Sequence, residues 1–367
     1  MRQIGNDIKK TINKVTVSYN DEGPDGAPAI IFIHGFPFNK SMWNSQMETL
    51  KKDYRVIAYD VRGHGNSESG NVDFSIELFG QDLILLMDTL KIEKAMLCGL
   101  SMGGYIALNA ITNYPERFTA LVLSDTNCAA DTPVSKDKRM KAIESIRKNG
   151  VEKYADESLK KLFAPESFTT NSKEVDKARE MITATSKQSL YNTLYALAKR
   201  KETCSKLPEI NVPVLILVGN EDVITPPKAA HSMHEIIKGS FLHVIHHAGH
   251  LSNMENPLEF NDQLKTFVTI VKQKSKKFPE KTQLGSNGQN QKIITSSEEV
   301  EKDLNAKILK ITMTINDQYP ELSKYLEEMP NTIPDEKNSE ITLKNLSTYY
   351  ESLNSILNKY KSDHPKN

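Results

Sequence analysis

The chain has 367 residues, of which 38% are hydrophobic and 26% are charged. This length exceeds one typical domain, and this composition is that of a folded globular protein, which excludes a largely disordered chain. Lysine plus arginine and aspartate plus glutamate both number 47, so there is no global positive charge to attract nucleic acid or an anionic membrane.

Short apolar runs follow one another from residue 14 to about 271. Most are continuous rather than alternating, which is typical of strands that helices cover on both faces of a parallel sheet. The predicted strands are 15–19, 29–35, 54–60, 94–100, 118–125, 212–219 and 241–246, and the predicted helices between them are 41–52, 75–90, 102–114 and 226–237. Strands that alternate with helices in this way predict an α/β fold with a doubly wound sheet.

One interval breaks this alternation, between the strands at 118–125 and 212–219. It contains no strand pattern and four helical patterns, at 134–148, 150–163, 172–182 and 186–200. We expect a helical lid at about 127–205, over the carboxyl ends of the strands, where open α/β sheets bind ligands. The alternative is that these helices only thicken the domain.

The character of the sequence changes after residue 271. Residues 272–295 are charged and rich in Gln and Asn, which predicts a linker between a domain at 1–271 and a second one. Apolar residues recur at helical spacing in 296–367, which predicts a small all-α C-terminal module. Apolar helix faces have to bury against something, so we expect this module to pack on itself, on the first domain or in a homodimer. A dedicated protein partner is the alternative.

The three cysteines are Cys98, Cys128 and Cys204, and none forms a C-x-x-C pair. We expect them to be buried, reduced thiols, which indicates a reducing compartment. The first residues, MRQIGNDIKK, lack the apolar stretch of a signal peptide, and no run reaches the roughly 18 apolar residues of a membrane span. We therefore expect a cytoplasmic protein that does not bind a membrane.

Residues 99–103 read Gly-Leu-Ser-Met-Gly, the G-x-S-x-G pattern of a serine nucleophile on a sharp strand-to-helix turn. An apolar strand leads into Ser101 and a helical pattern leaves it. Gly99 and Gly103 supply the small neighbours that such a strained serine needs. The bare motif also occurs in ordinary glycine-rich turns, so the rest of the chain has to supply a base and an acid.

A serine hydroxyl is a weak nucleophile and needs a base that is oriented by an acid. Asp222 follows the predicted strand at 212–219, and His250 lies in the loop after the strand at 241–246. Nucleophile, acid and histidine therefore come in the order Ser101, Asp222, His250, at one edge of the sheet.

Other residues compete for these roles. Asp125 ends a strand and Glu221 precedes Asp222, so both are alternatives for the acid. His246 and His247 sit at the end of a strand, and we expect them to be structural or to face solvent.

An oxyanion site needs two N–H groups. One is expected from Met102, the residue after the nucleophile, and the other from Phe36, in the loop HGFPFNKSMW after the strand at 29–35.

Five segments carry a family resemblance: HGFPFNKSMW, YDVRGHGNSE, GLSMGGYIAL, LVGNEDVITPP and AGHLSNMENP, in that order. On these residues the chain resembles the α/β-hydrolase superfamily over roughly residues 14–271. It looks most like the lid-bearing group that includes 3-oxoadipate enol-lactonases, small carboxylesterases and the stress-signalling hydrolase of the sigma-factor cascade in bacilli. The resemblance implies an α/β-hydrolase fold with Ser101 as nucleophile, Asp222 as acid, His250 as base, and the amides of Phe36 and Met102 as oxyanion donors.

These observations predict a serine hydrolase that cleaves a small carboxylic ester or lactone through an acyl-enzyme. One alternative is a sensor with slow turnover and a partner docked through the C-terminal helices. Another is perhydrolysis or C–C bond cleavage at the same site. The sequence contains no metal-ligand cluster, phosphate loop or dinucleotide fingerprint, so no cofactor and no metal are expected.

Overall fold

The computed structural model describes residues 2–277 and, further along, 307–308, 310–315, 319–322, 350, 353–354, 356–357 and 360. The chain divides into two compact units, Met1–Val271 and Lys272–Asn367. In the second unit, Ile315, Tyr319, Leu322, Leu353 and Leu357 bury against one another. The expected module at 296–367 otherwise lies outside the described residues, as does the expected linker beyond Lys277. Residues 272–277 are helical, because no proline or glycine interrupts helix α10 (Pro257–Lys277) before that point.

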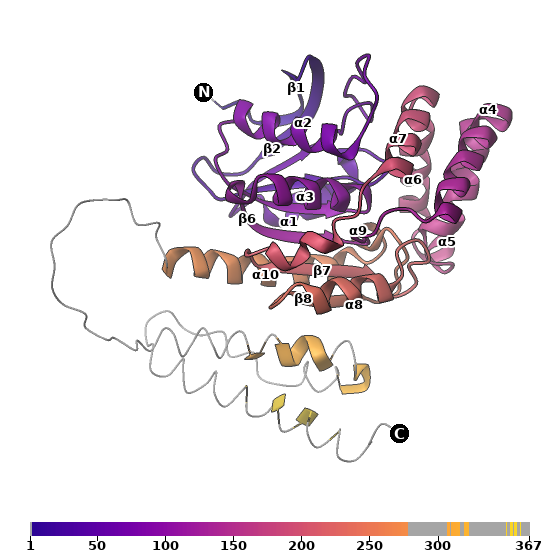
Figure 1. Cartoon of the computed structure of the whole chain (residues 1–367). Coiled ribbons are helices and arrows are strands. Elements are labelled where there is room, and N and C mark those ends of the chain that lie inside the picture. The colour runs from indigo at the N-terminus through magenta and orange to yellow at the C-terminus, as the bar shows by residue number, and fades with distance from the viewer. Residues whose placement is uncertain are drawn as a thin grey trace. The chain divides into compact units, whose positions relative to one another are not determined.

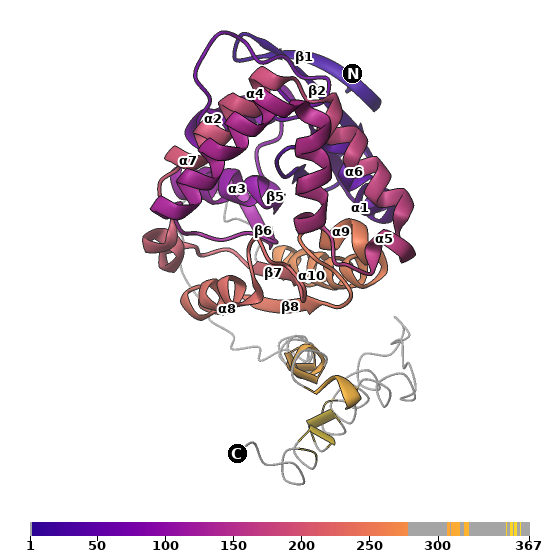
Figure 2. The ribbon, with the colours of Figure 1, turned by 90° about the vertical axis from the view of Figure 1, so that its right-hand side faces the viewer.

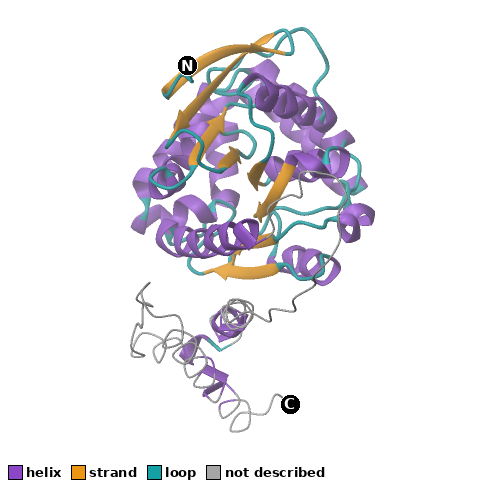
Figure 3. Cartoon of the chain, turned by 90° about the vertical axis from the view of Figure 1, so that its left-hand side faces the viewer, coloured by secondary structure: helices purple, strands orange, loops and turns teal. Residues whose placement is uncertain are grey.

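An eight-stranded sheet runs through the first unit in the order β1-β2-β4-β3-β5-β6-β7-β8. β2 pairs antiparallel with β1 and with β4, and every pair from β4 to β8 is parallel. The strands are β1 (Gly5–Ile12), β2 (Val15–Glu22), β3 (Ala29–Ile33), β4 (Arg55–Tyr59), β5 (Ala95–Leu100), β6 (Phe118–Ser124), β7 (Val214–Gly219) and β8 (Phe241–Ile245). Figure 3 shows them as a twisted sheet between helices. The predicted α/β fold with a mostly parallel sheet is confirmed.

Helices cover both faces of this sheet. Outside the insertion between β6 and β7, which lies at the position of the expected lid and keeps that name below, they are α1 (Asn44–Leu50), α2 (Ile76–Thr89), α3 (Met102–Asn113), α8 (Pro227–Ile236), α9 (Ser252–Glu255) and α10, with the short turns η1 (Lys40–Trp43), η2 (Pro115–Arg117) and η3 (Cys204–Glu209). α2, α3 and α8 share one core with the sheet. On the other face, the ring of Phe32 contacts Trp43 at 5.1 Å between centroids, and Trp43 contacts Phe260 of α10 at 6.1 Å. Because both faces are covered, every residue of β5 and of β7 is buried, which explains their continuous apolar runs.

Four helices fill the interval between β6 and β7. They are α4 (Pro133–Leu162), α5 (Ser167–Thr170), α6 (Ser172–Ala184) and α7 (Lys187–Lys199), and α4 is interrupted at Gly150, where φ is 88°. Figures 1 and 2 show α4, α6 and α7 grouped together beside the sheet. The insertion contacts two loops of the body: the His250 N–H donates to the Leu162 carbonyl at 2.8 Å, and the Thr185 hydroxyl donates to the Pro37 carbonyl at 3.2 Å.

The first strand, β1, is absent from the sequence-based prediction. Its sequence, GNDIKKTI, buries only Ile8 and Ile12, and its other residues are exposed or half-buried. β1 pairs with β2 alone, at the edge of the sheet. A polar edge strand carries little apolar patterning, so its periodicity did not identify it.

The prediction that all three cysteines are reduced thiols is wrong for two of them. Cys128 and Cys204 form a disulfide across 76 positions of sequence, and only Cys98 is a free, buried thiol. Cys128 follows β6 and Cys204 precedes β7, and the Thr203 N–H donates to the Cys128 carbonyl at 2.8 Å, so the two ends of the lid insertion meet at the disulfide. The inference of a reducing, cytoplasmic compartment loses the support of these thiols. Within the part of the chain that the structure describes, no helix is both long and apolar enough to cross a membrane.

Candidate active site

Ser101 lies in the turn between β5 and α3, with φ 54° and ψ −114°. A positive φ is costly for a residue with a Cβ, so the surrounding chain has to hold it. A Cβ on Gly99 would lie 2.3 Å from the Gly103 carbonyl oxygen, and a Cβ on Gly103 would lie 2.1 Å from the Ile33 carbonyl oxygen. The two glycines therefore allow the turn to close and let the end of β3 approach the start of α3.

Three side chains from distant segments meet at this turn. His250 Nε2 lies 2.8 Å from Ser101 Oγ, and His250 Nδ1 lies 2.8 Å from Asp222 Oδ2. Asp222 follows β7 and His250 follows β8, and parallel strands place their carboxyl ends at one edge of the sheet. Asp222 and His250 are 3% and 2% exposed, whereas Ser101 is half-buried. The three residues that the sequence singled out thus form one hydrogen-bonded chain.

The Asp222 carboxylate is oriented by its own loop. Its Oδ1 accepts hydrogen bonds from the N–H groups of Ile224 at 2.8 Å and Thr225 at 3.0 Å, and its Oδ2 accepts one from the Thr225 hydroxyl at 2.7 Å. Thr225 is not among the residues that the sequence motifs predicted for the site. The signal was available, because an aspartate that binds backbone N–H groups two and three residues further on is a common turn motif.

The charges of this group favour an ionised Asp222, and they favour the protonated form of His250 over its neutral form. Burial by itself lowers the pKa of His250, but the charge and hydrogen bond of Asp222, with the charges of Asp125 and Glu255, raise that pKa above its ordinary value. Burial by itself raises the pKa of Asp222, but the His250 charge and the donors of Thr225 hold it below its ordinary value. When His250 is neutral, its Nδ1–H donates to Asp222, which leaves Nε2 to accept the Ser101 hydroxyl proton.

Two backbone N–H groups lie beside Ser101. Met102 is the first residue of α3, where N–H groups have no acceptor within the helix. Phe36 follows Gly35, and a Cβ on Gly35 would lie 3.4 Å from the Cβ of Ser101, so this loop passes close to the serine. Within residues 2–277, the hydrogen bonds of turns and loops include neither amide. That both donate to an oxyanion at Ser101 stays a prediction.

The competing candidates lie outside this chain of hydrogen bonds. Asp125 is buried and is bound by other donors, and Glu221 is exposed. His246 is hydrogen-bonded to Glu259 at 2.9 Å, and His247 points to the surface with its side chain 77% exposed.

Glu255, on α9, is a residue that the sequence analysis missed. Its carboxylate accepts hydrogen bonds from the Gly249 N–H at 2.8 Å, and from the Ala164 N–H and the Ser167 hydroxyl of the lid at 2.7 Å each. Burial raises the pKa of Glu255, and these donors oppose that rise. These hydrogen bonds connect the loop that carries His250 to the lid. Sequence offered no signal, because the two lid donors are 91 and 88 positions away.

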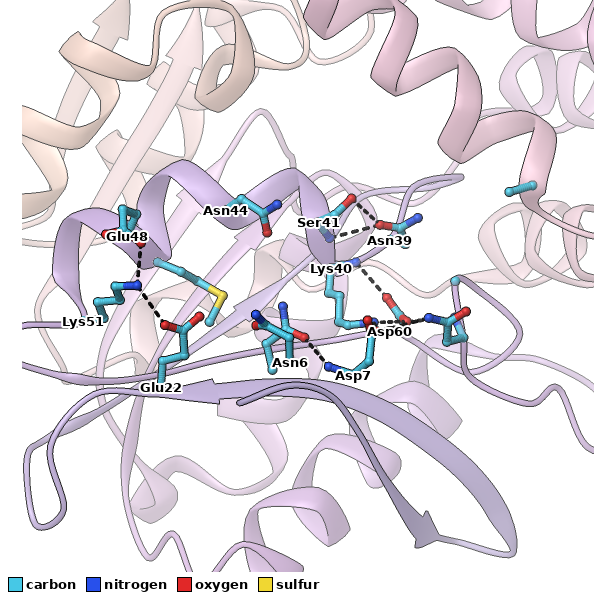
Figure 4. A pocket seen from close by; sticks show the side chains of 15 residues that line it. Asn6, Asp7, Glu22, Asn39, Lys40, Ser41, Asn44, Glu48, Lys51 and Asp60 are labelled. Carbon is cyan, nitrogen blue, oxygen red and sulfur yellow. Dashed lines mark hydrogen bonds and ion pairs between the residues drawn. The ribbon is translucent and has the colours of Figure 1, made fainter. Parts of the chain in front are cut away.

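The cavities that the structure describes are lined by residues other than these three candidates. One of about 660 Å³ is polar and lies beside Lys40 and Lys51. Figure 4 shows Lys40 between two carboxylates, Asp7 and Asp60, each with an oxygen 2.8 Å from its Nζ. Neither this cavity nor those of about 550 and 220 Å³ is lined by the three candidate side chains. Among the described residues, no group of three or more His, Cys, Asp or Glu side chains could hold a metal ion.

Comparison with known proteins places this geometry in context. Residues 28–257 match the family described as the alpha/beta hydrolase fold. The chain is 32% identical over 256 residues to a 3-oxoadipate enol-lactonase of Acinetobacter baylyi, covering 70% of this chain and 94% of that protein. It also resembles the structure of a thermophilic esterase from Thermogutta terrifontis, with 31% identity, a TM-score of 0.68, and coverage of 72% of this chain and 98% of that one.

A second solved structure is similar to the chain over nearly the same share of its length. The enol-lactonase from Burkholderia xenovorans LB400 superimposes with a TM-score of 0.68 at 27% identity, covering 71% of this chain and the whole of that chain. The relatives found on sequence and those found on structure therefore both include enzymes that act on ester bonds.

Proposed function

Because the chain belongs to the alpha/beta hydrolase fold family, we propose that it hydrolyses a small carboxylic ester or lactone, with Ser101 as nucleophile, His250 as base and Asp222 as the acid that orients it. The observation that carries this proposal is the unbroken hydrogen-bonded chain from Ser101 Oγ through both nitrogens of His250 to Asp222, with 2.8 Å at each step. Relatives named as enol-lactonases and esterases support ester bonds as the target.

The first half of the reaction forms the acyl-enzyme. Ser101 Oγ attacks the ester carbonyl carbon while its proton passes to His250 Nε2, which gives a tetrahedral intermediate and an imidazolium. The ionised Asp222 stabilises that imidazolium through the Nδ1–H bond. His250 then delivers the proton to the leaving alkoxide oxygen as the C–O bond breaks. For a lactone, that oxygen stays attached to the acyl group.

The second half releases the acid. Water gives a proton to His250 Nε2 and attacks the acyl carbon, and the proton returns to Ser101 Oγ as the acyl–oxygen bond breaks. In both halves the amides of Phe36 and Met102 donate to the oxyanion. Removing one such donor typically costs a factor of roughly 10² to 10³ in kcat.

The lid supports a small substrate. It contacts the body at Pro37, in the loop of the proposed oxyanion donor Phe36, and at His250. We expect the lid to enclose the acyl group near these contacts, and turnover therefore to fall as the acyl chain lengthens. A series of 4-nitrophenyl esters from acetate to octanoate measures this dependence.

The decisive experiment is labelling with a fluorophosphonate, combined with hydrolysis of 4-nitrophenyl acetate. We expect the wild type to be labelled once, and Ser101→Ala to be unlabelled with kcat lower by about 10³ or more. Ser205→Ala, which changes an exposed serine, serves as the matched control and should behave as the wild type. Unchanged turnover in Ser101→Ala would overturn the proposal. Labelling without turnover would favour the slow-turnover sensor, and turnover only with peroxide or a C–C substrate would favour the remaining alternatives.

A further inference from the structure

The segment Ser124–Thr126, at the end of β6, forms hydrogen bonds with both the N–H and the carbonyl group of Ser101. The Ser101 N–H donates to the Ser124 carbonyl at 2.9 Å, and the Thr126 hydroxyl donates to the Ser101 carbonyl at 2.8 Å. The strained turn of Ser101 is therefore held by this neighbouring strand end.

Asp125, in the middle of this segment, reaches the other two loops. Its N–H donates to the Leu217 carbonyl at 2.9 Å, and its Oδ1 accepts from the Gly219 N–H at 2.8 Å, three positions before the acid Asp222. Its Oδ2 accepts from the Ser252 hydroxyl at 2.5 Å, two positions after the base His250. One carboxylate thus links the segment that holds Ser101 to the end of β7, just before the loop of the acid, and to the start of α9, just after the loop of the base.

The backbone conformation of Asp125 and the burial of its carboxyl group both cost free energy of folding. Its φ is 45° and its exposed fraction is 0%. Within the described residues, no lysine or arginine forms an ion pair with it, and its side chain is satisfied by Ser124, Gly219 and Ser252. A buried carboxylate without a cation is unfavourable in a low-dielectric interior. The positive charge that arises nearby is the imidazolium of His250.

The titratable groups that face Asp125 are Asp222 from the loop after β7 and His250 from the loop after β8. Burial and, after it, the charge of Asp222 raise the pKa of Asp125 to about 7, while the charge of His250 and the hydrogen bonds of Ser252 and Ser124 oppose this rise. The influence is mutual, because the Asp125 charge raises the pKa of His250, as does Glu255 from α9. Ionisation of Asp125 and protonation of His250 therefore favour each other.

We propose that Asp125 is a positioning residue for the hydrolytic reaction, which holds the loops of nucleophile, acid and base in register and stabilises the imidazolium as it forms. This inference rests on the proposed function. Asp125 does not replace Asp222, because Asp222 makes the contact with His250 Nδ1. In its ionised form, above its pKa of about 7, it adds a second negative charge near the same histidine.

The test is the pH profile of kcat/KM for Asp125→Asn, with 4-nitrophenyl acetate followed at a wavelength where phenol and phenolate absorb equally. The amide keeps the shape of the carboxyl group and removes its charge. Without that charge the imidazolium is less stable, so His250 becomes neutral at lower pH. The acid limb is the part of the profile where kcat/KM falls as the pH is lowered, and we expect it to move to lower pH by roughly 0.5 unit. At the pH where activity is highest, we expect kcat to fall by about tenfold, because the three loops are no longer held in their relative positions.

Two further variants separate this role from stability. Asp82→Asn removes another buried carboxylate, which pairs with Arg62 at 2.7 Å, and it should leave the acid limb in place. Ser252→Ala removes one donor that lowers the pKa of Asp125, so a smaller fraction of Asp125 is ionised. It provides a milder test if Asp125→Asn does not fold, and it should shift the limb in the same direction by less.

The outcomes are distinct. A folded Asp125→Asn protein with an unchanged acid limb overturns the inference, even if its thermal stability has dropped. The pH dependence of fluorophosphonate labelling gives the same readout without turnover. If wild-type Ser101 is not labelled and does not support hydrolysis, the proposed function has failed instead, and the inference falls with it.

Discussion

At the scale of single residues, the turn at Ser101 depends on a glycine that has no room for a methyl group. Gly103 lies in a helix, and in a helix with free space at that position alanine would be more stable than glycine by about 1 kcal/mol. A Cβ on Gly103 would instead lie 2.1 Å from the Ile33 carbonyl oxygen and 3.0 Å from that of His34, and both belong to the backbone. We expect Gly103→Ala to lower the free energy of unfolding by about 3 kcal/mol or more, as measured by urea unfolding.

Gly80→Ala is the matched control, since Gly80 is also helical. A Cβ there would meet the Oδ1 of Asn109 at 2.5 Å, which is the end of a side chain that can rotate away. We expect a change below about 1 kcal/mol. Equal losses in the two variants would contradict the close approach of β3 to α3.

At the scale of elements, the strands explain why the site residues were predictable. The apolar runs at 94–100, 212–219 and 241–246 became β5, β7 and β8, which are parallel in one sheet. Their carboxyl ends share an edge, so polar residues just beyond each run come together even across 149 positions of sequence. Topology alone therefore brings Ser101 and His250 to the same place.

Other features depend on contacts that periodicity does not encode. The polar strand β1 buries too few side chains to show a pattern. The pairing of Cys128 with Cys204 depends on the path that the chain takes from the lid back to β7, and the link from Asp125 to Ser252 depends on two side-chain conformations. Each is decided by tertiary packing, which a single sequence does not reveal.

The disulfide leads to a prediction about the lid. It closes a loop of 76 positions that contains all four lid helices, and a cross-link of that span restricts the unfolded chain by up to about 4 kcal/mol. We expect reduction to lower the free energy of unfolding by up to that amount. Urea unfolding with and without dithiothreitol, together with a count of titratable thiols, measures the effect.

The double variant Cys128→Ser, Cys204→Ser is the control, because it should show the lower stability with no further response to dithiothreitol. Release of two thiols without any change in the unfolding midpoint would show that the lid ends are held by their other contacts, such as the Thr203 N–H to the Cys128 carbonyl at 2.8 Å.

At the scale of the whole molecule, two buried histidines tie the stability of the fold to pH. His34 accepts the Val61 N–H on Nε2 at 2.9 Å and faces the Gly35 carbonyl with Nδ1 at 2.8 Å, an arrangement that fits only the neutral ring. Burial lowers the pKa of His34 to about 4. Burial, with the neighbouring His34, lowers that of His64 to about 3, against an ordinary value of 6.5 for both.

These lowered pKa values predict that the free energy of unfolding falls as the pH drops from 6.5 towards 4. Over that interval the unfolded chain protonates both histidines and the folded chain protonates neither, so the unfolded state binds about two more protons. Asp125 opposes this, because its folded pKa of about 7 lies above its ordinary 3.8 and the folded state keeps that proton. The net difference of about one proton corresponds to a loss of about 1.4 kcal/mol per pH unit.

Guanidinium unfolding curves at several pH values between about 6.5 and 4.5 measure this slope. His64→Gln removes one of the two histidine protons, so the remaining one is balanced by Asp125 and the dependence should become nearly flat. Asp125→Asn removes the opposing group, so the loss should steepen to about 2.7 kcal/mol per unit. The two variants thus move the slope in opposite directions, and a wild-type stability that is constant or rises towards pH 4.5 would show that these rings are not held neutral by the fold.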